Sequence, residues 1–76
     1  MKEQVLEILG KVNKDLLTYT GENMVADGIL DSFELLDMIS KIEDAFDIEI
    51  DADYVTVEHF ANKDTIIALV EELVEE

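Results

Sequence analysis

The sequence predicts an all-α domain with three main helices, one short helix and a long loop between the first two main helices. Apolar residues recur at helical spacing in three separate segments, polar stretches divide these segments, and the chain has no proline. The 76 residues suffice for a single domain, residues 1–76. A domain of this size has a small core and no room for a deep cleft between subdomains, which disfavours an enzyme.

The first predicted helix runs from about Lys2 to Leu17. Its buried stripe consists of apolar residues at helical spacing: Val5, Leu9, Val12 and Leu16. The polar residues 18–23 then interrupt the periodicity, and the loop continues through Asp27 and Gly28. Several apolar residues predict that this loop lies across the core: Met24, Val25, Ile29 and Leu30.

The second main helix begins near Asp31 and has strong start signals. Asp31 is a good N-cap, and Glu34 falls at the N3 position of a capping box. Leu30 and Leu35 are placed to form a hydrophobic staple across the helix start. The buried stripe is Leu35, Met38, Ile39, Ile42 and Phe46. The helix is expected to end near Asp47.

The remainder of the chain predicts a connection, a short helix and a last main helix. Residues 47–51 alternate polar and apolar, and we expect an extended connection with Ile48 or Ile50 in the core, because no partner strand is evident. A short helical turn is expected around Tyr54 to Phe60. The last helix starts near its N-cap Asn62 and carries an apolar stripe: Ile66, Leu69, Val70, Leu73 and Val74.

The composition limits the partners and the compartment. The formal net charge of −15 repels nucleic acid and anionic membranes, so partners are expected to carry basic patches. The chain has no cysteine, which excludes disulfides and cysteine-based metal sites. No apolar stretch is long enough to span a bilayer, and the first residues lack the pattern of a signal peptide. We expect a cytoplasmic monomer without stable membrane insertion.

Ser32 is the candidate site of chemistry. If Asp31 caps the helix, Ser32 is the first helical residue and its hydroxyl is not needed for capping. A phosphate esterified there would lie at the positive end of the helix dipole, close to unpaired backbone N–H groups. The sequence therefore offers a free hydroxyl at a position that suits a phosphate group.

Two segments resemble the acyl and peptidyl carrier proteins. Residues 27–33, Asp-Gly-Ile-Leu-Asp-Ser-Phe, resemble the modification motif of that family, and residues 42–50 are similar to the end of its second helix. The resemblance covers nearly the whole chain and implies a four-helix acyl-carrier-like bundle. It also implies that Ser32 takes phosphopantetheine from coenzyme A, and that Asp31 contacts the modifying enzyme or its metal as well as capping the helix.

The resemblance implies a carrier without catalytic residues or a resident metal. A phosphopantetheinyl transferase would modify Ser32, and a ligase or acyltransferase would load the terminal thiol with an acyl or aminoacyl group. A downstream synthase or transferase with basic patches would dock on the second helix, on the residues Phe33, Leu36, Asp37, Ser40, Glu43 and Asp44. Burial in the core is the alternative for Phe33 and Leu36. Ser40 replaces an apolar residue common in carriers and Lys41 adds a positive charge, so we expect partners unlike those of a standard fatty-acid synthase.

The cargo stays open between fatty acyl, polyketide and amino acid. The chain is most similar to D-alanyl carrier proteins of teichoic acid modification in residues 28–32, 46–48 and 66–68, although Asp51 stands where those proteins often have proline. A long acyl chain would need a cavity lined by Leu9, Met38, Ile39, Ile42, Val55, Phe60 and Ile66. An amino acid would leave the core closed.

Two rival functions remain, an unmodified acidic helical interaction module and a small calcium buffer. Acidic residues match five positions of a calcium-binding loop: Asp47, Glu49, Asp51, Asp53 and Glu58. However, Ala52 occupies the sixth position, where the sharp turn requires glycine. His59, the only histidine, has no nearby nucleophile in the sequence and is expected to be structural.

Overall fold

The computed structural model describes residues 2–75, so Met1 and Glu76 of the predicted domain lie outside the described residues. The described residues contain helices and no strand, which confirms the all-α prediction. In chain order the elements are α1 (Lys2–Val12), α2 (Asp15–Thr18), α3 (Ser32–Phe46), the 3-10 helix η1 (Ala52–Tyr54) and α4 (Lys63–Glu75). None of these helices is long and apolar enough to cross a membrane.

The first predicted helix is divided into α1 and α2, so the prediction of one continuous helix to Leu17 is wrong. The Asn13 side chain accepts a hydrogen bond from the backbone N–H of Asp15 at 2.9 Å and donates one to the carbonyl of Ile29 at 3.2 Å. Asparagine competes with helical backbone bonds in this way. Asn13 therefore both interrupts the helix and attaches its end to the loop that precedes α3.

α3 begins and ends as predicted. The Asp31 carboxylate accepts from the N–H of Glu34 at 2.8 Å, and the Glu34 carboxylate accepts from the N–H of Asp31 at 3.3 Å, which completes the capping box. The helix ends where Asp47 takes a left-handed conformation, with φ 53° and ψ 49°, and donates its N–H to the carbonyl of Glu43. Both ends of α3 are thus fixed by local contacts.

Replacing Asp47 by glycine should stabilise the domain by about 1 kcal/mol, because a left-handed conformation strains residues with a Cβ atom. Urea denaturation should show a higher midpoint with an unchanged slope. Asp47→Ala is the control, since it removes the same charge but keeps the Cβ atom. An equal gain in both variants would assign the effect to charge and contradict the backbone explanation.

The connection after α3 is extended as predicted, and Ile50 is buried while Ile48 is half-buried. The carboxylate of Glu43 accepts the backbone N–H of Ile50 at 2.8 Å, which joins the connection to the helix. The short helical turn predicted around Tyr54 to Phe60 lies in the right segment but does not form one regular helix. The chain instead forms η1 and then a turn closed by the N–H of Phe60 and the carbonyl of Thr56 at 3.3 Å.

α4 starts from a reciprocal cap. The Asn62 side chain accepts from the N–H of Thr65 at 3.0 Å, and the Thr65 hydroxyl oxygen accepts from the N–H of Asn62 at 3.2 Å. This pair confirms the predicted start of the last helix near Asn62.

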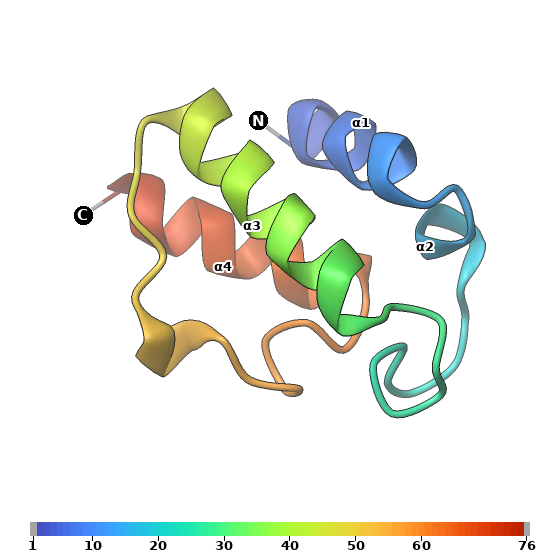
Figure 1. Ribbon diagram of the computed structural model, residues 1–76. Helices are drawn as coiled ribbons and strands as arrows, with labels where there is room; N and C mark the ends of the chain where they lie inside the picture. The colour runs from blue at the N-terminus through green and yellow to red at the C-terminus, as the bar shows by residue number, and fades with distance from the viewer. Residues whose placement is uncertain (1, 76) are drawn as a thin grey trace.

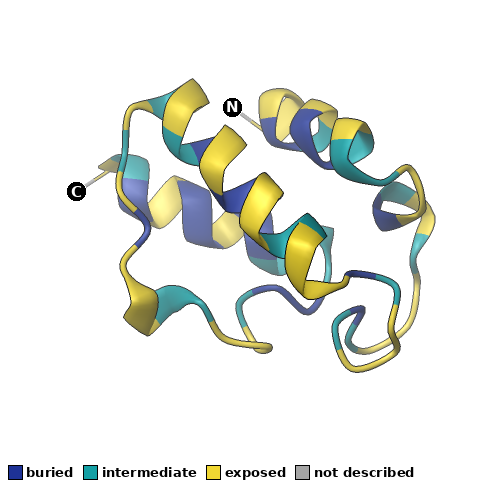
Figure 2. Ribbon diagram, viewed as in Figure 1, coloured by how far each residue is buried: buried dark blue, intermediate teal, exposed yellow. Residues whose placement is uncertain are grey.

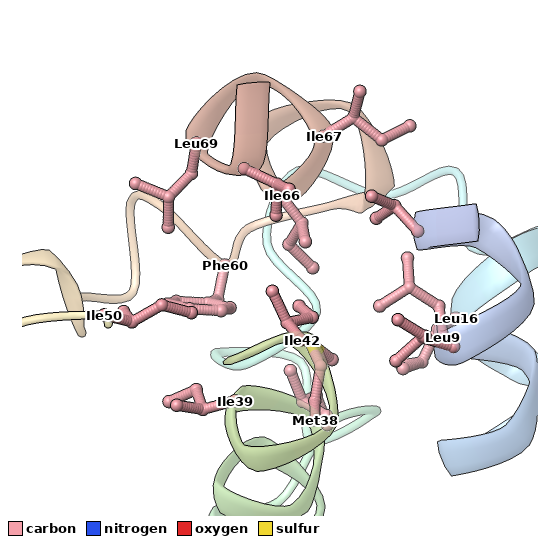
Figure 3. Close-up of a cluster of buried hydrophobic side chains, with 14 of the residues drawn as sticks. Leu9, Leu16, Met38, Ile39, Ile42, Ile50, Phe60, Ile66, Ile67 and Leu69 are labelled. Atoms are coloured by element: carbon pink, nitrogen blue, oxygen red, sulfur yellow. The ribbon is translucent and has the colours of Figure 1, made fainter. Parts of the chain in front are cut away.

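The core lies between α1, α3, α4 and the connection before α4 (Figure 1). α1 packs closely against α2, α3 and α4, whereas the backbones of α3 and α4 approach each other less closely. Large side chains from the connection fill the space between α3 and α4, where Phe60 and Ile50 lie between Leu69 above and Ile39 below (Figure 3). The space between α3 and α4 is therefore filled by apolar side chains.

Candidate functional site

Ser32 is the first residue of α3 and is exposed to solvent. Asp31, and not Ser32, accepts the N–H of Glu34, so the serine hydroxyl is not used as a cap. Among residues 2–75 this hydroxyl has no hydrogen-bond partner. The 15-residue helix α3 directs its positive end and its unpaired first N–H groups toward the same position. An anion attached to Ser32 would be stabilised there.

The loop before Ser32 is fixed to the segment before α4. The Asn23 side chain accepts the N–H groups of Val25 at 3.0 Å and Ala26 at 3.1 Å, and it donates to the carbonyl of Val57 at 3.0 Å. The N–H of Met24 donates to the carbonyl of Ala61 at 2.7 Å. Met24 is fully buried, as predicted for this loop. These bonds hold the segment that leads to Ser32.

Tyr19 and Asp27 close the same loop through a second set of bonds. The Tyr19 hydroxyl donates to the Asp27 carboxylate and accepts the N–H of Asn23 at 2.7 Å. Desolvation, and then the hydrogen bond to Asp27, raise the pKa of Tyr19 above its ordinary value. Because the folded pKa is raised, this contribution to stability is complete below the ordinary pKa and is lost as the pH rises through the raised value.

Gly28 ends this loop with φ 79°, a left-handed conformation that strains any residue with a Cβ atom. Its N–H donates to the carbonyl of Val25 at 3.2 Å and closes a turn. The glycine of the Asp27-Gly28 pair therefore has a conformational role. The sequence signal for it was the frequency of such pairs in turns.

The structure exposes the predicted docking residues of α3, with one exception. Phe33 is 84% exposed and Leu36 is 64% exposed, so burial in the core is excluded for both. Figure 2 shows the exposed outer face of α3, and the spacing of the exposed docking residues places them along it: Phe33, Leu36, Asp37, Ser40 and Asp44. The exception is Glu43, which is half-buried and bound to the N–H of Ile50.

Lys41 is paired within α3. The ammonium group of Lys41 lies 2.8 Å from the carboxylate of Asp37, four residues earlier, and this pair partly neutralises the positive charge noted in the sequence.

Val57 is a third exposed apolar residue. It is 52% exposed, and its carbonyl is bound to Asn23 of the loop before Ser32. Sequence reasoning missed Val57, because it lies in an irregular segment without periodicity.

A surface hollow of about 760 Å³ lies beside the second half of α3. Its walls combine carboxylates with apolar and polar side chains from α3, the connection and η1, including Ser40, Glu43, Asp44, Glu49, Asp51 and Tyr54. Three predicted docking residues thus border it, and the contribution of the connection was missed because it depends on tertiary packing. The residues predicted to line an acyl cavity instead belong to the packed core, with Val55 partly buried against it.

The acidic residues after α3 are not arranged as a calcium loop. Asp47 occupies the end of α3, and the Asp51 carboxylate accepts the N–H of Asp53 at 3.3 Å to cap η1. Among residues 2–75, no three metal-ligating side chains converge. His59 is engaged structurally, with Nδ1 at 2.9 Å from the Thr56 hydroxyl and its ring edge-on to Tyr54.

The net charge is expected to limit the stability of the domain. The longest dimension is 30 Å, and the Debye length is about 30 Å at 0.01 M salt and about 10 Å at 0.1 M. At low salt, charges across the whole domain therefore repel one another. We expect the melting temperature to rise with added sodium chloride. At matched ionic strength, millimolar magnesium or calcium should raise the melting temperature further, and the two divalent ions should raise it by equal amounts.

Differential scanning fluorimetry across these salts is the measurement. A steep rise with calcium alone at micromolar concentration would support the calcium-buffer rival. A melting temperature that no ion changes would contradict the role given to repulsion.

Comparison of the chain with protein-family models, curated proteins and solved structures gives no match. The resemblance to carrier proteins therefore stays a prediction. The geometry itself offers an exposed hydroxyl at a helix start, an exposed apolar and acidic helix face beside it, and a loop fixed by side-chain hydrogen bonds. An exposed hydroxyl in this position is chemically able to form a phosphate ester, whose charge the start of the helix would stabilise.

Proposed function

We propose that this chain is a carrier protein that holds acyl or aminoacyl groups as thioesters on a phosphopantetheine arm attached to Ser32. The observation that supports this proposal best is the exposed, unpartnered hydroxyl of Ser32 at the start of a helix that Asp31 caps. The resemblance of residues 27–33 to the carrier motif gives the chemical identity of the arm.

The attachment requires only a hydroxyl from this chain. The Ser32 oxygen attacks the pantetheine-side phosphorus of coenzyme A in the active site of a phosphopantetheinyl transferase, which takes the serine proton. A phosphodiester forms, and the nucleotide part of coenzyme A leaves. The new negative charge lies at the positive end of α3, where the helix dipole stabilises it. Asp31 would contact the transferase or its metal in addition to capping.

A loading ligase or acyltransferase and a downstream synthase or transferase would then bind the exposed face of α3. Phe33 and Leu36 provide apolar contacts, and the surrounding carboxylates fit enzymes with basic patches. The narrower form of the proposal is a D-alanyl carrier protein, supported by the similarity of residues 28–32, 46–48 and 66–68. The proposal includes a monomer in the cytoplasm, where coenzyme A is available.

Charge reversal on this face should slow modification. Asp44→Lys and Asp37→Lys remove negative charge from exposed positions and should lower the transferase rate by about tenfold at low ionic strength, because surface charges steer association. Modification rates measured across salt concentrations should also show a weaker salt dependence. Glu3→Lys is the control, since this exposed residue lies on α1. Equal effects at all three positions would contradict a docking face on α3.

The proposal is tested by the intact mass of the protein co-expressed with a broad-range phosphopantetheinyl transferase. One added phosphopantetheine is expected. The unmodified mass with several transferases would favour the helical interaction module, which binds partners without modification.

A further inference from the structure

Phe60 occupies the space between α3 and α4. Its side chain is fully buried, although it belongs to the irregular segment before α4 and not to a helix. In Figure 3 its ring lies between Leu69 of α4 and Ile39 of α3, with Ile50 beside it and Ile42 on the other side. Residues of α3 and α4 approach each other closely at fewer places than residues of α1 approach either helix, and the Phe60 ring lies between α3 and α4 (Figure 3).

The segment that carries Phe60 is held in place on both sides. The N–H of Phe60 bonds to Thr56, and the carbonyl of the next residue, Ala61, accepts the N–H of Met24 from the loop before Ser32. Asn23 of that loop binds the carbonyl of Val57. Displacement of this backbone segment would therefore break bonds to the loop before Ser32, and withdrawal of the ring would expose a large apolar surface to water.

We infer that Phe60 closes the space between α3 and α4 to the cargo, so that this chain carries short polar acyl groups, of the aminoacyl type, outside its core. The inference rests on the proposed function and specifies its substrate class. A flexible hydrocarbon chain would have to displace a fully buried aromatic ring from a close-packed site. A short polar group gains nothing from entering an apolar core, since its hydrogen bonds to water would be lost.

The test uses a phosphopantetheinyl transferase to attach acetyl, butyryl or octanoyl phosphopantetheine to Ser32 from the corresponding acyl coenzyme A. The wild-type protein should show the same melting temperature with all three groups. In Phe60→Ala, which leaves a cavity, the octanoyl form should melt several degrees above the acetyl form, because the chain fills that space. Phe60→Leu leaves a smaller cavity and should show the same trend more weakly. This variant replaces Phe60→Ala in the test if Phe60→Ala does not fold.

The outcomes separate the two proposals. Absence of any mass increase overturns the carrier function and the cargo assignment together. If the groups attach and the octanoyl form of the wild type is stabilised over the acetyl form, the carrier function stands and the role of Phe60 is overturned. Equal melting temperatures of the acetyl and octanoyl forms in both cavity variants would also overturn it, because removal of the ring would then not admit the chain.

Discussion

Ser32→Ala should abolish attachment of phosphopantetheine while the domain keeps its fold. The Ser32 side chain is exposed and has no hydrogen-bond partner among residues 2–75, so its removal breaks no described contact. Alanine is favourable in helices, and the cap formed by Asp31 and Glu34 remains. Intact-mass measurement should show no added group in the variant, with the circular dichroism and melting temperature of the wild type.

Ser40→Ala is the matched control for this experiment. Ser40 is the only other serine in the chain. It is also exposed on α3, but it lies in the middle of the helix and not at its start. Its hydroxyl is away from the positive end of α3, so the variant should still gain one phosphopantetheine at the end point; only the final mass is compared, because Ser40 lies on the proposed docking face. Addition of a phosphopantetheine group to Ser32→Ala would overturn the assignment of the site.

Leu30→Ala should destabilise the domain by about 2–5 kcal/mol, the range for truncation of a buried leucine. Leu30 is 2% exposed and directly precedes the N-cap of α3. Small domains have a total stability of roughly 0.05–0.15 kcal/mol per residue, so this loss is a large share for a chain of 76 residues. Urea denaturation followed by circular dichroism measures the change in the free energy of unfolding.

Leu36→Ala makes the same substitution at an exposed position of α3. Because Leu36 is 64% exposed, we expect a change within about 0.5 kcal/mol in stability. Loading by partner enzymes should nevertheless slow if Leu36 contributes to the proposed docking face. If both leucine variants lost similar stability, Leu36 would belong to the packing of the domain and not to a docking surface.

The helix boundaries that could be predicted are those set by local side chains. Asp31 and Glu34 form their capping box within four residues, and Asn62 and Thr65 do the same for α4. Such contacts depend only on sequence neighbours, so the starts of α3 and α4 were predicted correctly. The position of Ser32 at the start of α3 follows directly from the capping by Asp31.

Features that depend on distant parts of the chain could not be predicted. The end of α1 is attached to the loop before α3 by the bond from Asn13 to the carbonyl of Ile29, a contact across 16 positions of sequence. Glu43 was expected on the docking face, but its carboxylate binds the N–H of Ile50. Helical spacing also left open whether Phe33 was buried, since periodicity identifies the faces of a helix but not the packing of its first turn.

α3 connects these features, because one helix carries the proposed modification site, the proposed docking face and part of the border of the surface hollow. Its first residue bears the hydroxyl, its outer face is exposed, and its inner face provides Met38, Ile39 and Ile42 to the core. The loop before it is tied to the segment that carries Phe60 through Asn23 and Met24. The loop before the proposed attachment site and the segment that carries Phe60 are therefore held together by hydrogen bonds.

Fragmentation mass spectrometry of the protein after incubation with coenzyme A and a phosphopantetheinyl transferase tests the carrier function most directly. It locates the added group by residue. We predict one phosphopantetheine per chain, on Ser32, with none on Ser40. A group located on any other residue, or an unmodified Ser32 with several transferases, would contradict the proposed function.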